Sequence, residues 1–142
     1  MEKATKPVSY RILSCREVSF EKKHLTSGKL NAADISFKYG GHFKPDRNHL
    51  AIVLVVNLLV DGELSMKVES ETKFEVVPFD AAFDVSTEGR IVDHVGIMPT
   101  LFGLAFSSIR GMLAVRTAGT PLENYPLPLI NAVDATNKIL RK

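Results

Sequence analysis

Apolar and polar residues alternate through the first half of the chain, which predicts β-strands. Within residues 8–23 the alternation slips once in the middle, a pattern typical of a strand with a bulge. Residues 33–43 alternate through Ile35, Phe37 and Tyr39. Gly40-Gly41 and the polar segment 44–49 then predict a loop of some length.

Two further strands are expected in residues 49–77. Residues 49–60 are apolar on both faces of an extended chain, as expected of a central strand. Asp61-Gly62 follows and is a strong hairpin signal. Residues 63–77 then alternate between apolar and charged side chains, which predicts a strand with one buried face and one face in water.

The second half of the chain favours helices. Residues 95–115 carry a broad apolar stripe, with Pro99 in a favoured first-turn position and Gly119 placed to end the helix. A second helix is expected from Pro128 onward, with its apolar side chains turned inward: Leu129, Ile130, Val133 and Leu140. Between the strands and the long helix, residues 78–93 look irregular, with a turn of helix near Ala81-Ala82.

These elements predict an α+β fold in a single domain, residues 1–142. A four-stranded antiparallel sheet is followed by a long helix and a shorter C-terminal helix. A single helix layer covers only one face of such a sheet.

Composition narrows the class of protein. Apolar residues make up 45% and charged residues 24%, and the net charge of +2 does not indicate a partner made of nucleic acid. The single cysteine, Cys15, fits a reducing compartment. The longest apolar run, residues 50–60, is too short to span a bilayer, and no apolar signal core precedes Cys15. We therefore expect a cytoplasmic protein without membrane insertion.

No catalytic or cofactor motif is present, so we expect neither an enzyme nor a bound metal or other cofactor. The four histidines are dispersed, and none lies at metal-ligand spacing to a carboxylate. His42 and His49 share the predicted loop, which leaves a weak two-histidine site as the alternative to ordinary exposed side chains.

The long helix has more apolar surface than a two-layer domain can bury, and small residues interrupt it. We hypothesise that it packs against its copy in another subunit; the alternative is a core helix buried within one subunit. The expected interface residues are Leu101, Leu104, Ala105, Ser108 and Met112.

Aromatic residues flank Gly40-Gly41, and a proline-rich bridge containing Leu127 links the two helices. Such glycine-rich segments beside aromatics form adaptable apolar grooves, although ordinary loop-anchoring side chains would give the same composition.

Three segments resemble the SecB-type export chaperones: REVSFEKK at 16–23, VVNLLVDGELSMKVES at 55–70 and GTPLENYPLPLIN at 119–131. The likeness covers nearly the whole chain through the order and spacing of these segments. It implies a cytoplasmic holdase, a dimer of dimers (homotetramer), that binds unfolded polypeptide clients without ATP. By position, the resemblance implies client contacts at Phe37, Tyr39, Phe43, Leu127, Ile130, Val133 and Leu140.

The resemblance also implies a place for the translocase motor to dock, at Glu17, Glu21 and Glu69. Basic residues crowd the same segments and the chain ends at Lys142 without the family's tail, which argues against this docking. Two other functions stay open. One is a dedicated interaction module or structural oligomer with one partner, such as an antitoxin; the other is a carrier of a small ligand or lipid.

Overall fold

The computed structural model describes residues 7–23 and 30–140. Its elements are β1 (Ser9–Lys22), the 3-10 turn η1 (Ala32–Asp34), β2 (Ile35–Asp46), β3 (His49–Val60) and β4 (Glu63–Val77), followed by α1 (Phe79–Ala82), β5 (Phe83–Val85), β6 (Ile91–Asp93), α2 (Met98–Thr117) and α3 (Ala132–Leu140). The predicted α+β architecture, with four antiparallel strands before a long and a short helix, is confirmed.

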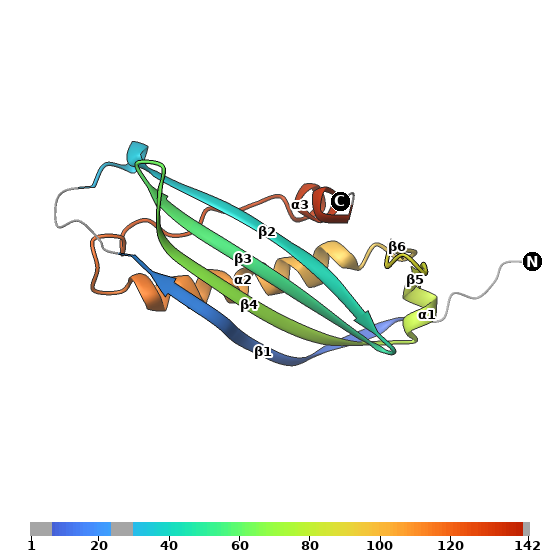
Figure 1. Cartoon of the computed structure of the whole chain (residues 1–142). Coiled ribbons are helices and arrows are strands. Elements are labelled where there is room, and N and C mark those ends of the chain that lie inside the picture. Colours follow the sequence, from blue (N-terminus) through green and yellow to red (C-terminus); the bar gives the residue numbers. More distant parts are fainter. Residues whose placement is uncertain (1–6, 24–29, 141–142) are drawn as a thin grey trace, which may run out of the picture.

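The main sheet has the strand order β1-β4-β3-β2. Hairpins join β2 to β3 and β3 to β4. Strand β1 comes first in the chain and lies beside β4, which makes the Greek key arrangement. Helix α2 crosses one face of the sheet, while α3 lies beside β2 (Figure 1). We call the face under α2 the helix-side face and the opposite one the open face.

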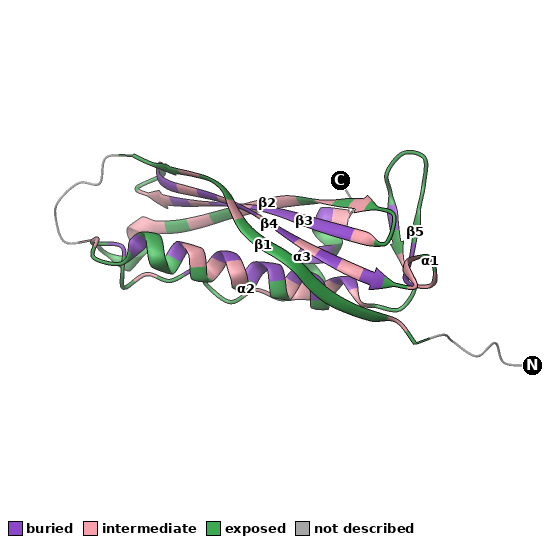
Figure 2. Cartoon of the chain, turned by 90° about the horizontal axis from the view of Figure 1, so that it is seen from below, coloured by how far each residue is buried: buried purple, intermediate pink, exposed green. Residues whose placement is uncertain are grey.

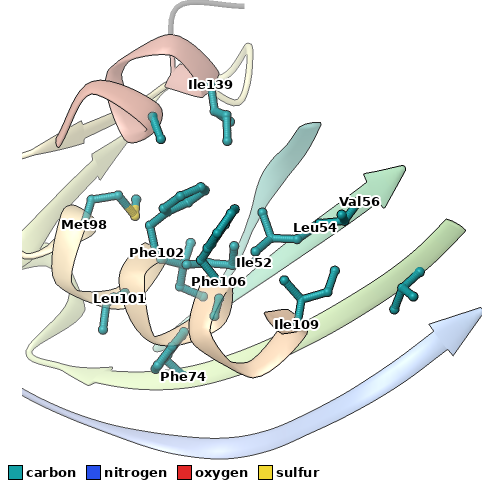
Figure 3. Packing of buried hydrophobic residues seen from close by; sticks show 14 of the residues in the cluster. Ile52, Leu54, Val56, Phe74, Met98, Leu101, Phe102, Phe106, Ile109 and Ile139 are labelled. Carbon is teal, nitrogen blue, oxygen red and sulfur yellow. The ribbon is translucent and has the colours of Figure 1, made fainter. Parts of the chain in front are cut away.

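The core lies between α2 and the helix-side face (Figure 3). Strand β3 contributes its alternate residues from Leu50 to Leu58, all fully buried. Helix α2 meets them with a stripe that includes Leu101, Phe102 and Ile109. Burying a large apolar side chain stabilises the fold by roughly 1.5–3 kcal/mol. This layer therefore supplies most of the hydrophobic stabilisation.

Helix α2 is also the one described helix long and apolar enough to cross a membrane. Its apolar stripe packs against the sheet, and 39% of its most apolar window is buried.

Local signals set the turn between β3 and β4 and the two ends of α2. Asp61 and Gly62 both have positive φ, 52° and 79°, as the predicted tight hairpin requires. Pro99 lies in the first turn of α2, and Gly119 follows the helix with a φ of 77°, both as expected. The cap at the start of α2 was not foreseen: the Asp93 carboxylate accepts hydrogen bonds from the amides of Val95, Ile97 and Met98, at 3.2, 3.2 and 2.7 Å.

The predicted loop after Tyr39 was wrong. Strand β2 runs through Gly40-Gly41 to Asp46, and only Arg47-Asn48 separate it from β3. Every residue of β2 is paired with β3, Gly41 with Leu54 for example. The regular ladder along a central apolar strand outweighs the roughly 0.5–1 kcal/mol cost of each glycine.

Two further expectations, on β1 and on residues 78–93, need correction. Strand β1 has two irregularities, between Ile12 and Ser14 and between Glu17 and Ser19, where the pattern predicted one. Within residues 78–93 the turn of helix is present as α1, but the rest forms the short hairpin β5–β6.

The last helix begins at Ala132 and not at Pro128, because Asn131 Oδ1 caps it by accepting the amide of Asp134 at 3.1 Å. Its register therefore differs from the predicted one. Leu129 is 87% exposed and Val133 53% exposed, while Ala135 and Ile139 are buried.

The two neighbouring glycines of β2 give a matched test of this packing. A Cβ at Gly41 would overlap the carbonyl oxygen of Val53 and lie 2.8 Å from Leu54 Cδ2, whereas a Cβ at Gly40 meets nothing within 4 Å. We expect Gly41→Ala to lower the free energy of unfolding by about 1–3 kcal/mol. Gly40→Ala should leave it unchanged or raise it slightly. Urea unfolding of both variants measures this, and equal midpoints would contradict the packing described here.

Candidate functional site

A cavity of about 310 Å³ lies where β2, the β5–β6 hairpin and the end of α3 meet. We call it the edge cavity. Its lining residues are Gly41, His42 and Phe43 of β2, Glu88, Gly89, Arg90 and Ile91 of the hairpin, and Ile139 and Leu140 of α3. Three separate parts of the chain thus surround one partly apolar hollow at the edge of the sheet.

Three aromatic residues of β2 are half-buried beside the core, and one of them, Phe43, lines the cavity. Phe37, Tyr39 and Phe43 pair with core residues of β3, so their side chains share the helix-side face. The Tyr39 ring meets Phe106 edge-on at 5.4 Å between centroids. Phe43 meets Phe102 in the same way at 6.4 Å. All three are half-buried, and α2 holds the rings of Tyr39 and Phe43.

The bridge between α2 and α3 is tied to α2 by an arginine. Arg110 donates hydrogen bonds to the carbonyls of Leu127 and Pro128 at 3.2 and 3.3 Å, and its guanidinium lies 5.3 Å from the centre of the Phe106 ring. Further along, α3 approaches α2 closely, because a Cβ at Gly103 would be 3.9 Å from Ala132 Cβ. These contacts hold α3 beside β2 and so set the width of the hollow.

The predicted client residues do not form one surface. Phe43 and Leu140 meet in the edge cavity, with Phe37 and Tyr39 farther along the same strand face. Ile130 is half-buried against the core, and Val133 faces solvent. Leu127 is only 4% exposed, so its side chain belongs to the core and is not available to a client.

Sequence reasoning missed several residues of this region. Ile91 and Arg90 reach the cavity because β5–β6 folds as a hairpin, and the turn-forming segment Ser86–Gly89 was the signal that could have indicated it. Ile139 and the exposed Leu129 depend on where α3 begins, which the capping by Asn131 decides.

A second cavity, of about 370 Å³, lies at the C-terminal end of β2. It is lined by Pro45, Arg47, Phe79, Asp80, Phe83, Asp84 and Val85. Asp84 is also 2.8 Å from His94 Nε2. Among residues 7–23 and 30–140, no three His, Cys, Asp or Glu side chains are placed to hold a metal ion. His24 lies outside the described residues.

The predicted interface on α2 divides into buried and accessible residues. Leu101 and Ala105 are fully buried against the sheet, so they cannot contact another subunit. Leu104 is exposed, and Ser108 and Met112 are half-buried. On the same side of the molecule, β1 is exposed along nearly its whole length (Figure 2). Its exposed apolar side chains are Tyr10, Ile12, Leu13 and Val18.

The three glutamates considered for motor docking lie on two faces. Glu17 is on the helix-side face, where Arg116 binds its carboxylate at 2.6 and 3.3 Å and stacks 4.2 Å above the Phe20 ring. Glu21 and Glu69 are on the open face, and Glu21 is opposite Lys67.

Around Glu21 and Glu69 the open face has mixed charge. Arg11 pairs with Glu75 at 2.9 Å and Arg16 with Glu71 at 3.2 Å. The three glutamates therefore do not make a single acidic surface.

No family model matches the chain, and no curated protein matches it in sequence. Among solved structures, it is similar to the SecB-like chaperone Rv1957 of Mycobacterium tuberculosis, solved in complex with a ChAD peptide from the Rv1956 HigA1 antitoxin. The TM-score is 0.53 at 13% sequence identity, and the match covers 86% of each chain. The chain has a SecB-like fold. The family resemblance noted in the sequence is thus confirmed at the level of structure.

The ion pairs of the open face give a pH-dependent prediction. A hydrogen bond from Arg11 lowers the pKa of Glu75 below its ordinary value of 4.5, and the positive charges of Arg11 and His49 act in the same direction. A carboxylate with a lowered pKa stabilises the folded state above its ordinary pKa, and this contribution is lost as the pH falls through the folded value.

We therefore expect Arg11→Gln to raise the pKa of Glu75, measured by carbon-detected NMR titration. Arg16→Gln, on the same face, should leave the Glu75 titration unchanged. A Glu75 carboxyl that titrates at the same pH with and without Arg11 would contradict the ion pair.

Proposed function

We propose that this protein is an ATP-independent holdase that binds unfolded or non-native polypeptides. The observation that carries the proposal is the edge cavity. It opens between a sheet edge and the last helix of a SecB-like fold, and the half-buried aromatic residue Phe43 lines it. The similar Mycobacterium protein was solved with a peptide bound, which supports a polypeptide as the ligand class.

The surface suits a ligand of variable sequence. A holdase needs apolar area of adaptable shape, and not a few fixed hydrogen bonds, because it binds many sequences. Leu129 and Val133 add exposed apolar side chains on the bridge and on α3. An unfolded segment loses conformational freedom on binding, so several such contacts along one chain are needed to hold it.

We also propose that subunits assemble into a cytoplasmic homotetramer, a dimer of dimers. Tyr10 and Ile12 of β1 point to the helix-side face but extend past α2, and Val115 of α2 is 75% exposed. Together with Leu104 they leave apolar surface that one subunit does not cover. A particle with several client sites would also hold a long client by avidity.

The client function is tested with Leu129→Ser and Val133→Ser together. These side chains are exposed, so the variant should keep its stability and lose much of its ability to suppress aggregation of a reduced, unfolded client. Light scattering of the client with wild-type and variant protein, without ATP, measures this.

Val95→Ser is the matched control, because Val95 is 46% exposed but belongs to the segment between β6 and α2 and does not line the edge cavity. Full suppression of aggregation by the double variant, or an equal loss in the control, would count against these residues. No suppression by the wild type would contradict the holdase itself.

Assembly is tested with Ile12→Glu. A charge at this exposed apolar position should shift the particle from about four subunits of 15.7 kDa to smaller species in light scattering. Ser14→Glu is the control on the same strand, since Ser14 is opposite Lys73 on the open face and should leave the mass unchanged. A monomeric wild type at micromolar concentration would exclude the tetramer.

A dedicated client is the second candidate function. The peptide in the similar structure comes from an antitoxin, which favours a chaperone devoted to one partner over a general export role. The mixed charge of the open face agrees, because it offers no acidic surface for an export motor. A dedicated chaperone would pull down one partner and bind generic unfolded chains poorly.

A further inference from the structure

The outer edge of β2 is free to pair with another strand. Within the described part of the chain, β2 pairs only with β3 and is the last strand of the sheet. The unpaired N–H and C=O groups of an edge strand are a template for an added strand. Strand β2 is 12 residues long, so the template is of useful length.

The edge cavity lies at the outer strand of the sheet. His42 and Phe43 are neighbours in a strand, so their side chains point to opposite faces. Gly41, which has no side chain, also lines the hollow, so the cavity reaches the backbone of β2. A chain in that hollow would be next to the backbone of Gly41–Phe43.

The two rows of side chains along β2 differ sharply in chemistry. The helix-side row contains the aromatics Phe37, Tyr39 and Phe43. The open-face row contains Lys38, His42 and Lys44, all exposed, with Gly40 between them and no carboxylate before Asp46. Among the described residues, Lys38 and Lys44 join no ion pair, unlike the arginines of β1 on the same face.

The basic row also opposes pairing of β2 with its own copy. An antiparallel pairing centred on Gly41 would put Lys38 opposite Lys44, and like charges directly opposite each other destabilise a sheet. The hairpin at the cavity contributes one acid and one base, Glu88 and Arg90, and so does not change this balance. The free edge is therefore better suited to a foreign segment that carries acidic residues.

We propose that β2 binds its client by strand addition, and that the preferred client segment alternates apolar and acidic residues. Apolar side chains of the added strand lie over the aromatic row and the edge cavity. Acidic side chains lie over Lys38, His42 and Lys44. This inference rests on the proposed holdase function and specifies which polypeptides the site selects.

The proposal is tested by fluorescence anisotropy at low salt with three short labelled peptides. In all three peptides every second residue is apolar, alternately valine and phenylalanine. The residues between them are glutamate in the first peptide, serine in the second and lysine in the third. The glutamate peptide should bind more tightly than the serine peptide by roughly 2- to 30-fold, as two opposite-charge cross-strand pairs imply, and the lysine peptide should bind most weakly.

Location is tested with Lys38→Gln and Lys44→Gln together. This variant should lose the preference for glutamate over serine while it still binds the serine peptide. The matched control is Lys67→Gln with Lys73→Gln, which removes the same charge from β4 on the same face and should keep the preference. Equal affinity for the three peptides, or loss of the preference in the β4 control, overturns the proposal.

Backbone pairing is tested with the glutamate peptide N-methylated along its centre, which should bind at least tenfold more weakly because the methyl groups remove the amide donors. Unchanged affinity overturns strand addition. The particle mass of wild type and of the β2 variant tests whether a second copy of the chain binds at this edge. An equal mass excludes the second copy. A larger particle in the variant overturns the proposal that a foreign segment binds there. Failure of all three peptides, including the serine peptide, would instead contradict the holdase function.

Discussion

The structure depends on a mismatch in width between one helix and four strands. A helix with its side chains is about 10–12 Å across, whereas four strands spaced about 4.8 Å apart need more cover than that. Helix α2 therefore buries the central strands β3 and β4 and leaves both outer strands partly open. On the β1 side, among the described residues, no second element covers the gap, and apolar side chains such as Ile12 stay exposed. On the β2 side, α3 partly closes it.

The bridge between α2 and α3 determines where α3 lies beside β2. Arg110 fastens the carbonyls of Leu127 and Pro128 to α2, and Gly103 lets Ala132 approach. These contacts bring α3 back beside β2, and a cavity is left between β2, the end of α3 and the β5–β6 hairpin. The long junction therefore allows α2 to pack on the sheet while α3 borders the edge cavity.

The two edges of the sheet differ in charge as well as in cover. At β1 and β4 the open face has paired charges, and the pKa of Glu75 is lowered by its arginine partner. At β2 the same face has two lysines that pair with no acid among the described residues. We propose that this difference lets one edge serve self-assembly and the other serve a client, since cross-strand charge pairs favour some added strands and oppose others.

The sequence alone determined what depends on neighbours along the chain. Periodicity predicted the four strands and the long helix, and Asp61-Gly62 and Gly119 marked turns whose backbone favours those residues. The fold family was also within reach of the sequence. Tertiary structure decided what depends on distant partners. Pairing with β3 made Gly40-Gly41 part of a strand, and the register of α3 placed Val133 in solvent. Burial in the core removed Leu127 and Leu101 from the surface. The pattern of apolar residues shows that a side chain is to be covered, but only packing in space decides which element covers it.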